Sequence, residues 1–525
     1  TTFLQHPGGG QRDGLIHAVY GGVYGKQHGV LEGHPRTGEL MPVLAHFGVA
    51  APCGLTRLET AELGNGFSDS LLACQFNLHK VSRHVLAPRD ATFIVQSEDL
   101  VSCDHVDFHP TDVLEDADGS VLVIDTGGWY MICCPTSQEE KPEVLGGIYR
   151  LRRPGKHQIA DPRGLAIDWP TLAAGELVAY LADPRWAVRQ RAQDVLSKQG
   201  KQAVPALVEA IEAPASDVQS LTAIWTLTRI EDPAARAAVR TAVHETTEEV
   251  RQAALHSVAI WRDRLAIKPL AALLQGDSIP NRRAAAEAIG RIGARESVDP
   301  LLAAAADYQG RVLEHSLIYA LIEIGDVESI RRGLAADNPS TQRAALMAIE
   351  NLAPEVLQPE RIVGLLESNE AVLAETAWWI IERHPEWADA MASFFRQKVA
   401  GPQLSPELAA NLVRFAASPP IQEIGATGLA ASAVPRGTQV AILDALAADG
   451  PPKMPESWLE LLTQVLASDD PQLVAKAVCV FHAHTGSPTT PHLATRLQRA
   501  TSNASLPVEI RLKALVAGGG ETPLE

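Results

Sequence analysis

Residues 108–130 read FHPTDVLEDADGSVLVIDTGGWY, and this stretch decides how the first part of the chain is interpreted. The Asp-Gly pair at 118–119 favours a tight hairpin turn. An apolar pair precedes the turn at 113–114, and an apolar run follows it at 121–124. The pattern predicts two short antiparallel strands that end at Asp125, where a glycine-containing loop begins.

A second copy of this pattern lies upstream, because Pro52 and Pro110 are 58 residues apart and each copy leads to a basic strand. Repeats of roughly 50 residues built from short strands are typical of β-propeller blades. We therefore predict a partial β-propeller of about two to three blades over residues 1–165. A propeller usually has roughly four to eight blades. We thus expect the sequence to be a fragment and the isolated chain to have little activity.

From Thr171 onward the sequence becomes rich in alanine and leucine at helical spacing. Asp183 can cap a helix that has Pro184 at its first position. Similar phrases recur at 334–339 and 466–471, at intervals close to multiples of about 31–33 residues. This period predicts a helix pair repeated roughly nine or ten times. The predicted fold class is a multidomain β + α chain, with an all-α HEAT-type solenoid over residues 166–525.

Composition excludes several classes of function. The formal net charge of −18 argues against nucleic acid as the main partner. No run of 18 apolar residues occurs, so we expect no transmembrane segment. Six cysteines form no CxxC pair, which excludes a zinc knuckle and a CxxCH haem-attachment motif. The cysteines could be buried thiols or form one or two disulfides, and the adjacent Cys133 and Cys134 could form a strained vicinal one.

Polar residues at the start of inner propeller strands, and in the loops after these strands, line the central tunnel where ligands usually bind. This placement makes His109 and Asp112 catalytic candidates, and Asp125, Trp129 and Tyr130 cofactor-binding candidates. A carboxylate beside an imidazole can orient a general base or coordinate calcium. The alternative is that Asp112 and Asp125 cap turns and accept hydrogen bonds from backbone amides.

Two further clusters have competing interpretations. Cys103, His105 and His109 lie close in sequence but lack a fourth ligand at a diagnostic distance, so we predict no metal site and a surface loop instead. The tryptophans at 378–379 and Trp387 could form a partner-binding patch, but helical spacing favours a place in the core.

The blocks at 51–55, 76–86, 108–120, 133–138 and 147–150 resemble the membrane-bound dehydrogenase family of planctomycete-type bacteria. Those are secreted proteins with a sugar-dehydrogenase-like propeller, a HEAT solenoid and often a terminal cytochrome c domain. The resemblance implies a periplasmic or secreted protein. More distantly, the propeller is similar to sugar and sorbosone dehydrogenases that use pyrroloquinoline quinone with calcium. Their Arg-Asn-Pro-x-Gly element reads Ala-Ala-Pro-Cys-Gly here, without the Arg and Asn, and no haem site is present.

The resemblance implies part of an oxidoreductase that acts on a sugar-like substrate, with the solenoid as a docking surface for a protein partner. The alternative is a non-catalytic protein-binding scaffold with a degenerate propeller. A metal-dependent lactonase is a third possibility, but it would need carboxylates on several blades, and the sequence does not display them.

Overall fold

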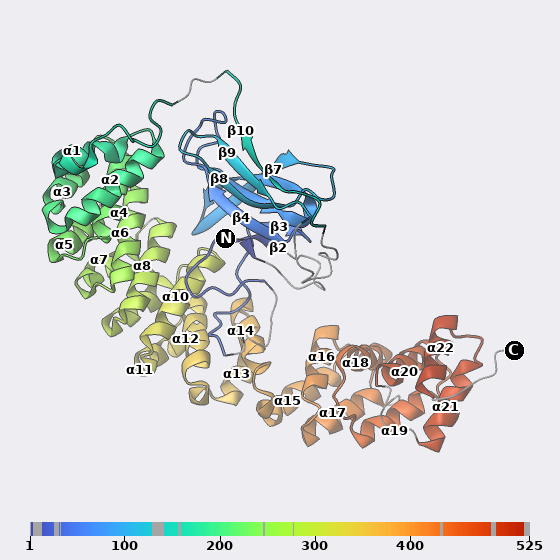
Figure 1. The fold of residues 1–525 in the computed structure, drawn as a ribbon. Helices are drawn as coiled ribbons and strands as arrows, with labels where there is room; N and C mark the ends of the chain where they lie inside the picture. The colour runs from blue at the N-terminus through green and yellow to red at the C-terminus, as the bar shows by residue number, and fades with distance from the viewer. Residues whose placement is uncertain are drawn as a thin grey trace. The chain divides into compact units, whose positions relative to one another are not determined.

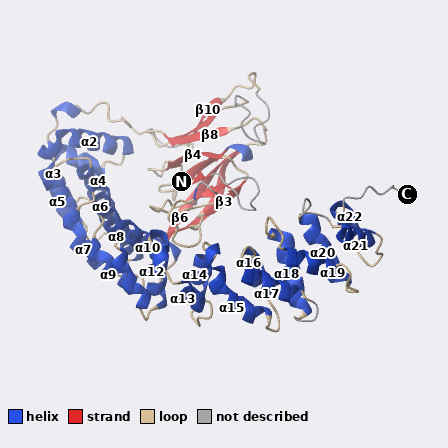
Figure 2. Ribbon diagram, turned by 90° about the horizontal axis from the view of Figure 1, so that it is seen from below, coloured by secondary structure: helices blue, strands red, loops and turns tan. Residues whose placement is uncertain are grey.

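The computed structural model describes residues 2–3, 13–25, 31, 33–128, 141–155, 159–244, 247–276, 278–430, 434–484 and 490–518. The chain forms two compact units, Thr1–Pro354 and Glu355–Glu525, which we call the first and second unit. The first unit begins with small β-sheets and continues with helices (Figure 1), and the described part of the second unit contains helices but no strand (Figure 2).

Ten strands form three antiparallel sheets in the described residues. The first sheet contains β1 (Thr2–Phe3), β2 (Asp13–Leu15) and β3 (Ala45–Gly48). The second contains β4 (Pro52–Arg57), β5 (Leu71–Gln75), β6 (Lys80–Arg89) and β7 (Thr92–Ser102). The third contains β8 (Pro110–Glu115), β9 (Val121–Asp125) and β10 (Gly147–Leu151).

The predicted hairpin of residues 108–130 is confirmed as β8 and β9. Val113 pairs with Val123, and the turn closes where the Gly119 N–H donates to the Asp116 carbonyl at 2.8 Å. Gly119 has a φ of +75°, and a side chain there would collide with Glu62. The turn therefore requires glycine for its backbone conformation and for the close approach of the neighbouring loop.

The second and third sheets share one hydrophobic core. Buried residues from both sheets form a single cluster, namely Leu58, Leu72, Cys74, Val81, Phe108, Val113, Val121 and Val123. The strands β4 and β8 approach so closely that a Cβ built on Gly54 would lie 2.5 Å from the Cα of Asp112. Each fully buried Val or Leu side chain contributes about 1.5–3 kcal/mol, so this shared core holds the two sheets together.

The predicted propeller is not shown. The three sheets are small and open, with three or four strands each. Among the described residues, the chain passes from β10 to helices, so no further sheet follows that could close a ring. The sequence pattern predicts strands and their turns correctly because these are local, whereas ring closure depends on how many sheets pack around an axis.

The prediction of a helical solenoid is confirmed. The described residues form 22 α-helices, slightly more than the predicted nine or ten helix pairs. The first unit contains α1 (Ala174–Ala179), α2 (Trp186–Gln199), α3 (Val204–Glu212), α4 (Asp217–Thr228), α5 (Pro233–Ala242), α6 (Glu248–Trp261), α7 (Ile267–Leu273), α8 (Ile279–Ile292), α9 (Val298–Ala304), α10 (Arg311–Ile324), α11 (Val327–Ile330) and α12 (Pro339–Leu352).

The second unit contains α13 (Pro359–Leu365), α14 (Ala371–Ile381), α15 (Ala388–Val399), α16 (Pro406–Arg414), α17 (Pro419–Leu429), α18 (Arg436–Asp449), α19 (Glu456–Val465), α20 (Pro471–Ala483), α21 (Pro491–Thr501) and α22 (Val508–Ala517). Even-numbered helices stack on one another from α2 to α12 and again from α16 to α22, and odd-numbered helices form the second layer. No helix in the described part of the chain is long and apolar enough to span a membrane.

The recurring Asp/Asn-Pro motif marks the start of a helix at two of its three positions in the sequence. Asn338 caps α12 by accepting the N–H of Ser340 at 2.9 Å, and Asp470 caps α20 in the same way. The prediction that Asp183 caps a helix with Pro184 at its first position is wrong, because α2 begins at Trp186 and its N-cap residue is Arg185. The Asp183 carboxylate accepts the backbone N–H of Arg185 at 2.8 Å and pairs with the Arg185 guanidinium at 2.8 Å. The predicted apolar face of α2 is confirmed, since Val188, Ala192 and Leu196 are fully buried.

Candidate functional site

The structure brings together two of the residues proposed from sequence, His109 and Asp125, at the buried end of the β8–β9 hairpin. The Asp125 carboxylate accepts the backbone N–H groups of His109 (2.9 Å) and Gly127 (2.8 Å). The His109 Nδ1–H donates to the Gly127 carbonyl at 2.7 Å, and its ring stacks on Phe76 at 4.4 Å. This is the geometry of a turn cap, the alternative that the sequence left open.

Asp112 is exposed on β8 and accepts the N–H of Val113 at 2.9 Å. Trp129 and Tyr130 lie outside the described residues, as do Cys133 and Cys134. The catalytic role of His109 and Asp112, and the cofactor role of Asp125, stay predictions.

The cysteines of the sheets are free thiols where the structure describes them. Burial raises the pKa of the Cys74 thiol, and burial likewise raises the pKa of Cys53, whose S–H donates to the Pro110 carbonyl at 3.2 Å. Thiols with raised pKa values are poor nucleophiles. Within the described ranges no group of three His, Cys, Asp or Glu side chains could hold a metal ion.

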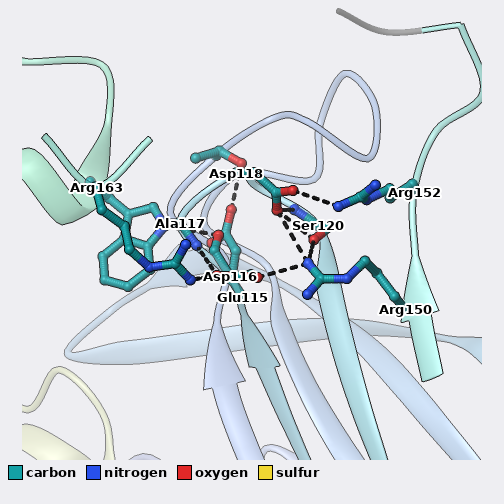
Figure 3. A network of polar contacts seen from close by, with 10 residues as sticks. Glu115, Asp116, Ala117, Asp118, Ser120, Arg150, Arg152 and Arg163 are labelled. Carbon is teal, nitrogen blue, oxygen red and sulfur yellow. Dashed lines mark hydrogen bonds and ion pairs between the residues drawn. The ribbon is translucent and has the colours of Figure 1, made fainter. Parts of the chain in front are cut away.

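A network of carboxylates and guanidinium groups surrounds the hairpin turn (Figure 3), and the sequence did not suggest it. Asp116 binds Arg150 at 2.7 Å and also pairs with Arg163, while Asp118 pairs with Arg152 at 2.9 Å. Burial raises the pKa of Asp116, but the hydrogen bond from Arg150 and the other nearby donors outweigh it, so the net shift is downward. Guanidinium groups therefore fill the positions that a cation would take among these carboxylates.

The same turn joins the sheets to the first helices. The Trp186 indole N–H of α2 donates to the Asp116 carbonyl at 3.3 Å, and Arg189 pairs with Glu59 at 3.0 Å. We interpret the network as a structural joint within the first unit, because every charged group in it has a partner from the chain.

A second polar site lies on the even-numbered helices of the first unit. Residues 17–24 and 33–41, which we call the strap, contact α8, α10 and α12. Asn351 of α12 pairs with both backbone groups of Arg36: its Oδ1 accepts the N–H at 2.8 Å, and its Nδ2 donates to the carbonyl at 2.8 Å. Arg311 of α10 donates to the carbonyl of Glu39 at 2.8 Å.

A buried histidine links the two limbs of the strap, the first limb being residues 17–24 and the second residues 33–41. The Nε2–H of His315 donates to the Tyr20 carbonyl at 2.9 Å, and its Nδ1 accepts from the Thr37 hydroxyl at 2.7 Å. The Thr37 oxygen in turn accepts from Arg311 at 2.9 Å. Burial lowers the pKa of His315 from 6.5 to about 4, so the ring is neutral at pH 7 and can accept from Thr37.

Two glycines fit the strap to the helices. Gly21 has a φ of +71°, and a Cβ there would enter the ring of Tyr319. Gly38 has a φ of +119°, and its Cβ would lie 3.0 Å from the Arg343 guanidinium and 3.1 Å from the Met347 methyl group. Both positions therefore combine a backbone conformation that favours glycine with a close approach to a helix side chain.

Charged side chains from α8 and α10 flank the first limb. Arg283 is 5% exposed and pairs with Glu287 at 3.3 Å. Arg291 lies over the Tyr20 ring at 4.7 Å, and the Tyr20 hydroxyl donates to Glu323 at 3.0 Å. Burial raises the pKa of Glu323 and lowers that of Arg283.

The sequence contains a periodic signal for this face. Polar or large residues recur at four-residue spacing, at 283, 287 and 291 in α8, at 315, 319 and 323 in α10, and at 343, 347 and 351 in α12. Residues at this spacing share one face of a helix. Trp378, Trp379 and Trp387, which the sequence pattern placed in the core, are half-buried instead, and Trp379 stacks on the Arg383 guanidinium at 3.4 Å.

Comparison with solved structures gives several similar chains. An engineered protein is 18% identical, with 66% of this chain and 99% of that chain covered and a TM-score of 0.25. A Kap121p mutant is 12% identical, with 65% and 44% covered and a TM-score of 0.42. Kap95p, whose binding is reported to induce the switch loops of RanGDP to adopt the GTP-bound conformation, is 14% identical, with 66% and 56% covered and a TM-score of 0.30. The chain thus spans about half the length of these two Kap proteins.

No curated protein sequence matches the chain. None of these comparisons supports the predicted dehydrogenase resemblance. A family model described as HEAT repeats matches residues 174–259 and 243–322. The helices of the first unit from α1 to α10 therefore include HEAT repeats, in agreement with the period read from the sequence.

Proposed function

We propose that the chain is a protein-binding scaffold whose stacked even-numbered helices carry segments of partner proteins. One observation carries the proposal: α10 and α12 hold a segment of the chain, the strap, through hydrogen bonds to its main chain, and Arg291 of α8 lies over the strap residue Tyr20. Stacked helical repeats generate long surfaces of this kind, and proteins built from them commonly bind other proteins.

Site-specific photo-cross-linking in the second unit tests the scaffold function. A photoreactive residue replaces Ala483, which is exposed on the even-numbered helix α20, and a matched control carries it at Glu423, exposed on the odd-numbered helix α17. Both chains are irradiated in an extract of the source organism. We expect discrete protein adducts from position 483 and not from position 423. Equal adducts from the two positions, or none from 483, would contradict the proposal.

Dehydrogenase activity is a separate hypothesis that rests on the sequence resemblance alone. The Asp125 carboxylate is bonded to two backbone amides and Asp112 to the backbone of its own strand, so these residues do not form a donor set for a quinone or calcium. We therefore derive no catalytic step through a quinone. Titration with pyrroloquinoline quinone and calcium, followed by dye reduction with a panel of sugars, tests the hypothesis, which fails if no saturable binding is observed.

A further inference from the structure

We propose that the face of α8, α10 and α12 is a peptide-recognition groove that the strap occupies in cis. An extended partner segment containing a Thr-Gly pair binds the same groove by displacing the strap. This inference rests on the proposed scaffold function and assigns it a site, a ligand class and a means of regulation.

The groove recognises a main chain more than it recognises side chains. Asn351 pairs with the N–H and the carbonyl of a single residue, Arg36, and this bidentate pairing is available to any extended segment. Arg311 and His315 add bonds to the carbonyls of Glu39 and Tyr20. Bonds to backbone groups provide affinity, and the few pockets for side chains provide specificity.

The surface under the strap differs from a permanent core. Arg283 Nε, Arg291 Nε and Glu323 Oε2 are buried and have no hydrogen-bond partner among the described residues. Each such group costs about 1–3 kcal/mol when it loses water without gaining a partner. The strap also buries apolar side chains, Val19 and Met41 of its own and Met347 of α12, so the surface is mixed, and its unpartnered polar groups favour a segment that exchanges.

The helices do not depend on the strap for their own core. Fully buried apolar side chains hold the even-numbered helices to their neighbours, including Ala285 and Ile289 in α8, Ile318 and Leu321 in α10, and Ala345 and Ile349 in α12. Because these residues face the helix layers, the groove is expected to persist when the strap leaves.

The contacts of Thr37 and Gly38 define the ligand class. The Thr37 hydroxyl is within hydrogen-bond distance of both His315 (2.7 Å) and Arg311 (2.9 Å), so a residue with a hydroxyl fits here. Gly38, at a φ of +119° between Arg343 and Met347, leaves little room for a side chain. A partner segment that places Thr-Gly at this point reproduces both contacts.

The test uses a fluorescent synthetic peptide of residues 33–41, GHPRTGELM, and a chain whose strap is expelled by Gly21→Val and Gly38→Val. Both substitutions act on the strap and leave the groove residues unchanged. Gly33→Ala is the matched control, because a Cβ at Gly33 meets nothing within 4 Å. If the double variant does not fold, Gly38→Val alone carries the test, since a φ of +119° strains valine in the strap while its Cβ meets only the ends of the flexible side chains of Arg343, Met347 and Arg311.

We expect the double variant to bind the peptide at least about tenfold more tightly than the Gly33→Ala control, in which the strap still occupies the groove. Adding Asn351→Ala should weaken this binding by about tenfold, because the bidentate bond to the main chain is lost. Hydrogen exchange should quicken in the strap and stay unchanged in α8, α10 and α12.

The inference is overturned if the peptide does not bind although the strap exchanges freely, or if α8, α10 and α12 lose protection together with the strap. The second result would make the strap part of the folded core. Either result leaves the scaffold function intact when position 483 still captures a partner, so failure of the groove and failure of the scaffold function can be distinguished.

Discussion

The α12 helix of the first unit and the α20 helix of the second begin in the same way but present different surfaces. Both have proline at the first position and an Asn or Asp cap. Counted from these caps, Arg343, Met347 and Asn351 of α12 correspond to Ala475, Cys479 and Ala483 of α20. Large and polar side chains contact the strap in the first unit, whereas small side chains take these positions in the second.

The neighbouring helix α22 continues the difference. Leu512 and Val516 occupy the corresponding positions there and are 57% and 59% exposed. The repeats of each unit therefore have an apolar core of the same kind, and the positions outside that core determine what each unit can bind. The polar face of the first unit forms hydrogen bonds to a main chain, which suits a segment that exchanges. The exposed face of small and apolar residues in the second unit is typical of an interaction surface.

The largest expected loss of stability comes from a core substitution, and it should be confined to the unit that carries the substitution. Trp458 is fully buried, and its indole N–H donates to the Gln422 carbonyl at 2.7 Å. Trp458→Ala should cost about 3–5 kcal/mol because it opens a cavity and removes the hydrogen bond of the indole N–H. Hydrogen exchange should show the loss in the second unit, and Leu321→Ala should show it in the first. Equal loss of protection in both units after either substitution would mean that they unfold as one.

Acid should weaken the first unit before the second. Burial lowers the pKa of His315 from 6.5 to about 4, so its contribution to stability is fully present above pH 6.5 and is lost as the pH falls toward 4. The loss amounts to about 3 kcal/mol. In the second unit, the hydrogen bond from Arg436 lowers the pKa of Asp470 from 3.8 to about 2, and that contribution is lost only below pH 3.8.

Chemical denaturation at several pH values between 6.5 and 4, with hydrogen exchange to assign each transition, measures this difference. The raised pKa of Glu323 acts in the opposite direction, so His315→Gln is the control that isolates the histidine. This variant should have a shallower dependence on pH in the first unit. An unchanged slope would contradict the role assigned to His315.

Loss of the hydrogen bonds between the Asn351 side chain and the main chain of Arg36 should have a smaller effect. Asn351→Ala removes two hydrogen bonds to Arg36 and should reduce the stability of the strap by about 1–3 kcal/mol. Faster hydrogen exchange in residues 33–41 would measure the change. Ala483→Asn, at the corresponding exposed position of α20, is the matched control and should change stability by less than about 0.5 kcal/mol.

The smallest effect is expected from a surface ion pair of the second unit. Asp444 and Lys476 pair at 2.5 Å, and both side chains are substantially exposed. Asp444→Ala should therefore cost less than about 1 kcal/mol. Glu314→Ala breaks a more buried pair with Arg343 in the first unit, at 2.6 Å, and should cost more in the same denaturation experiment. Equal losses of unfolding free energy would show that the more buried ion pair contributes no more to stability than the exposed one.

The local pattern of the sequence determined the hairpin around residues 118–119 and the repeated helices with their Pro-containing starts. These features depend on neighbours in sequence, since turn chemistry, caps and apolar periodicity act over a few residues. The same local pattern failed at Asp183, because α2 begins only at Trp186 and the Asp183 carboxylate pairs with the Arg185 guanidinium ahead of the helix.

The site was decided by tertiary structure alone. Arg36 and Asn351 are 315 residues apart in the chain, and Thr37 and His315 are 278 apart, so no period in the sequence links them. Asp116 likewise meets Arg163 only after the sheets pack against the first helices. Sequence periodicity specifies which residues share a face, and the packing of distant segments decides what that face contacts.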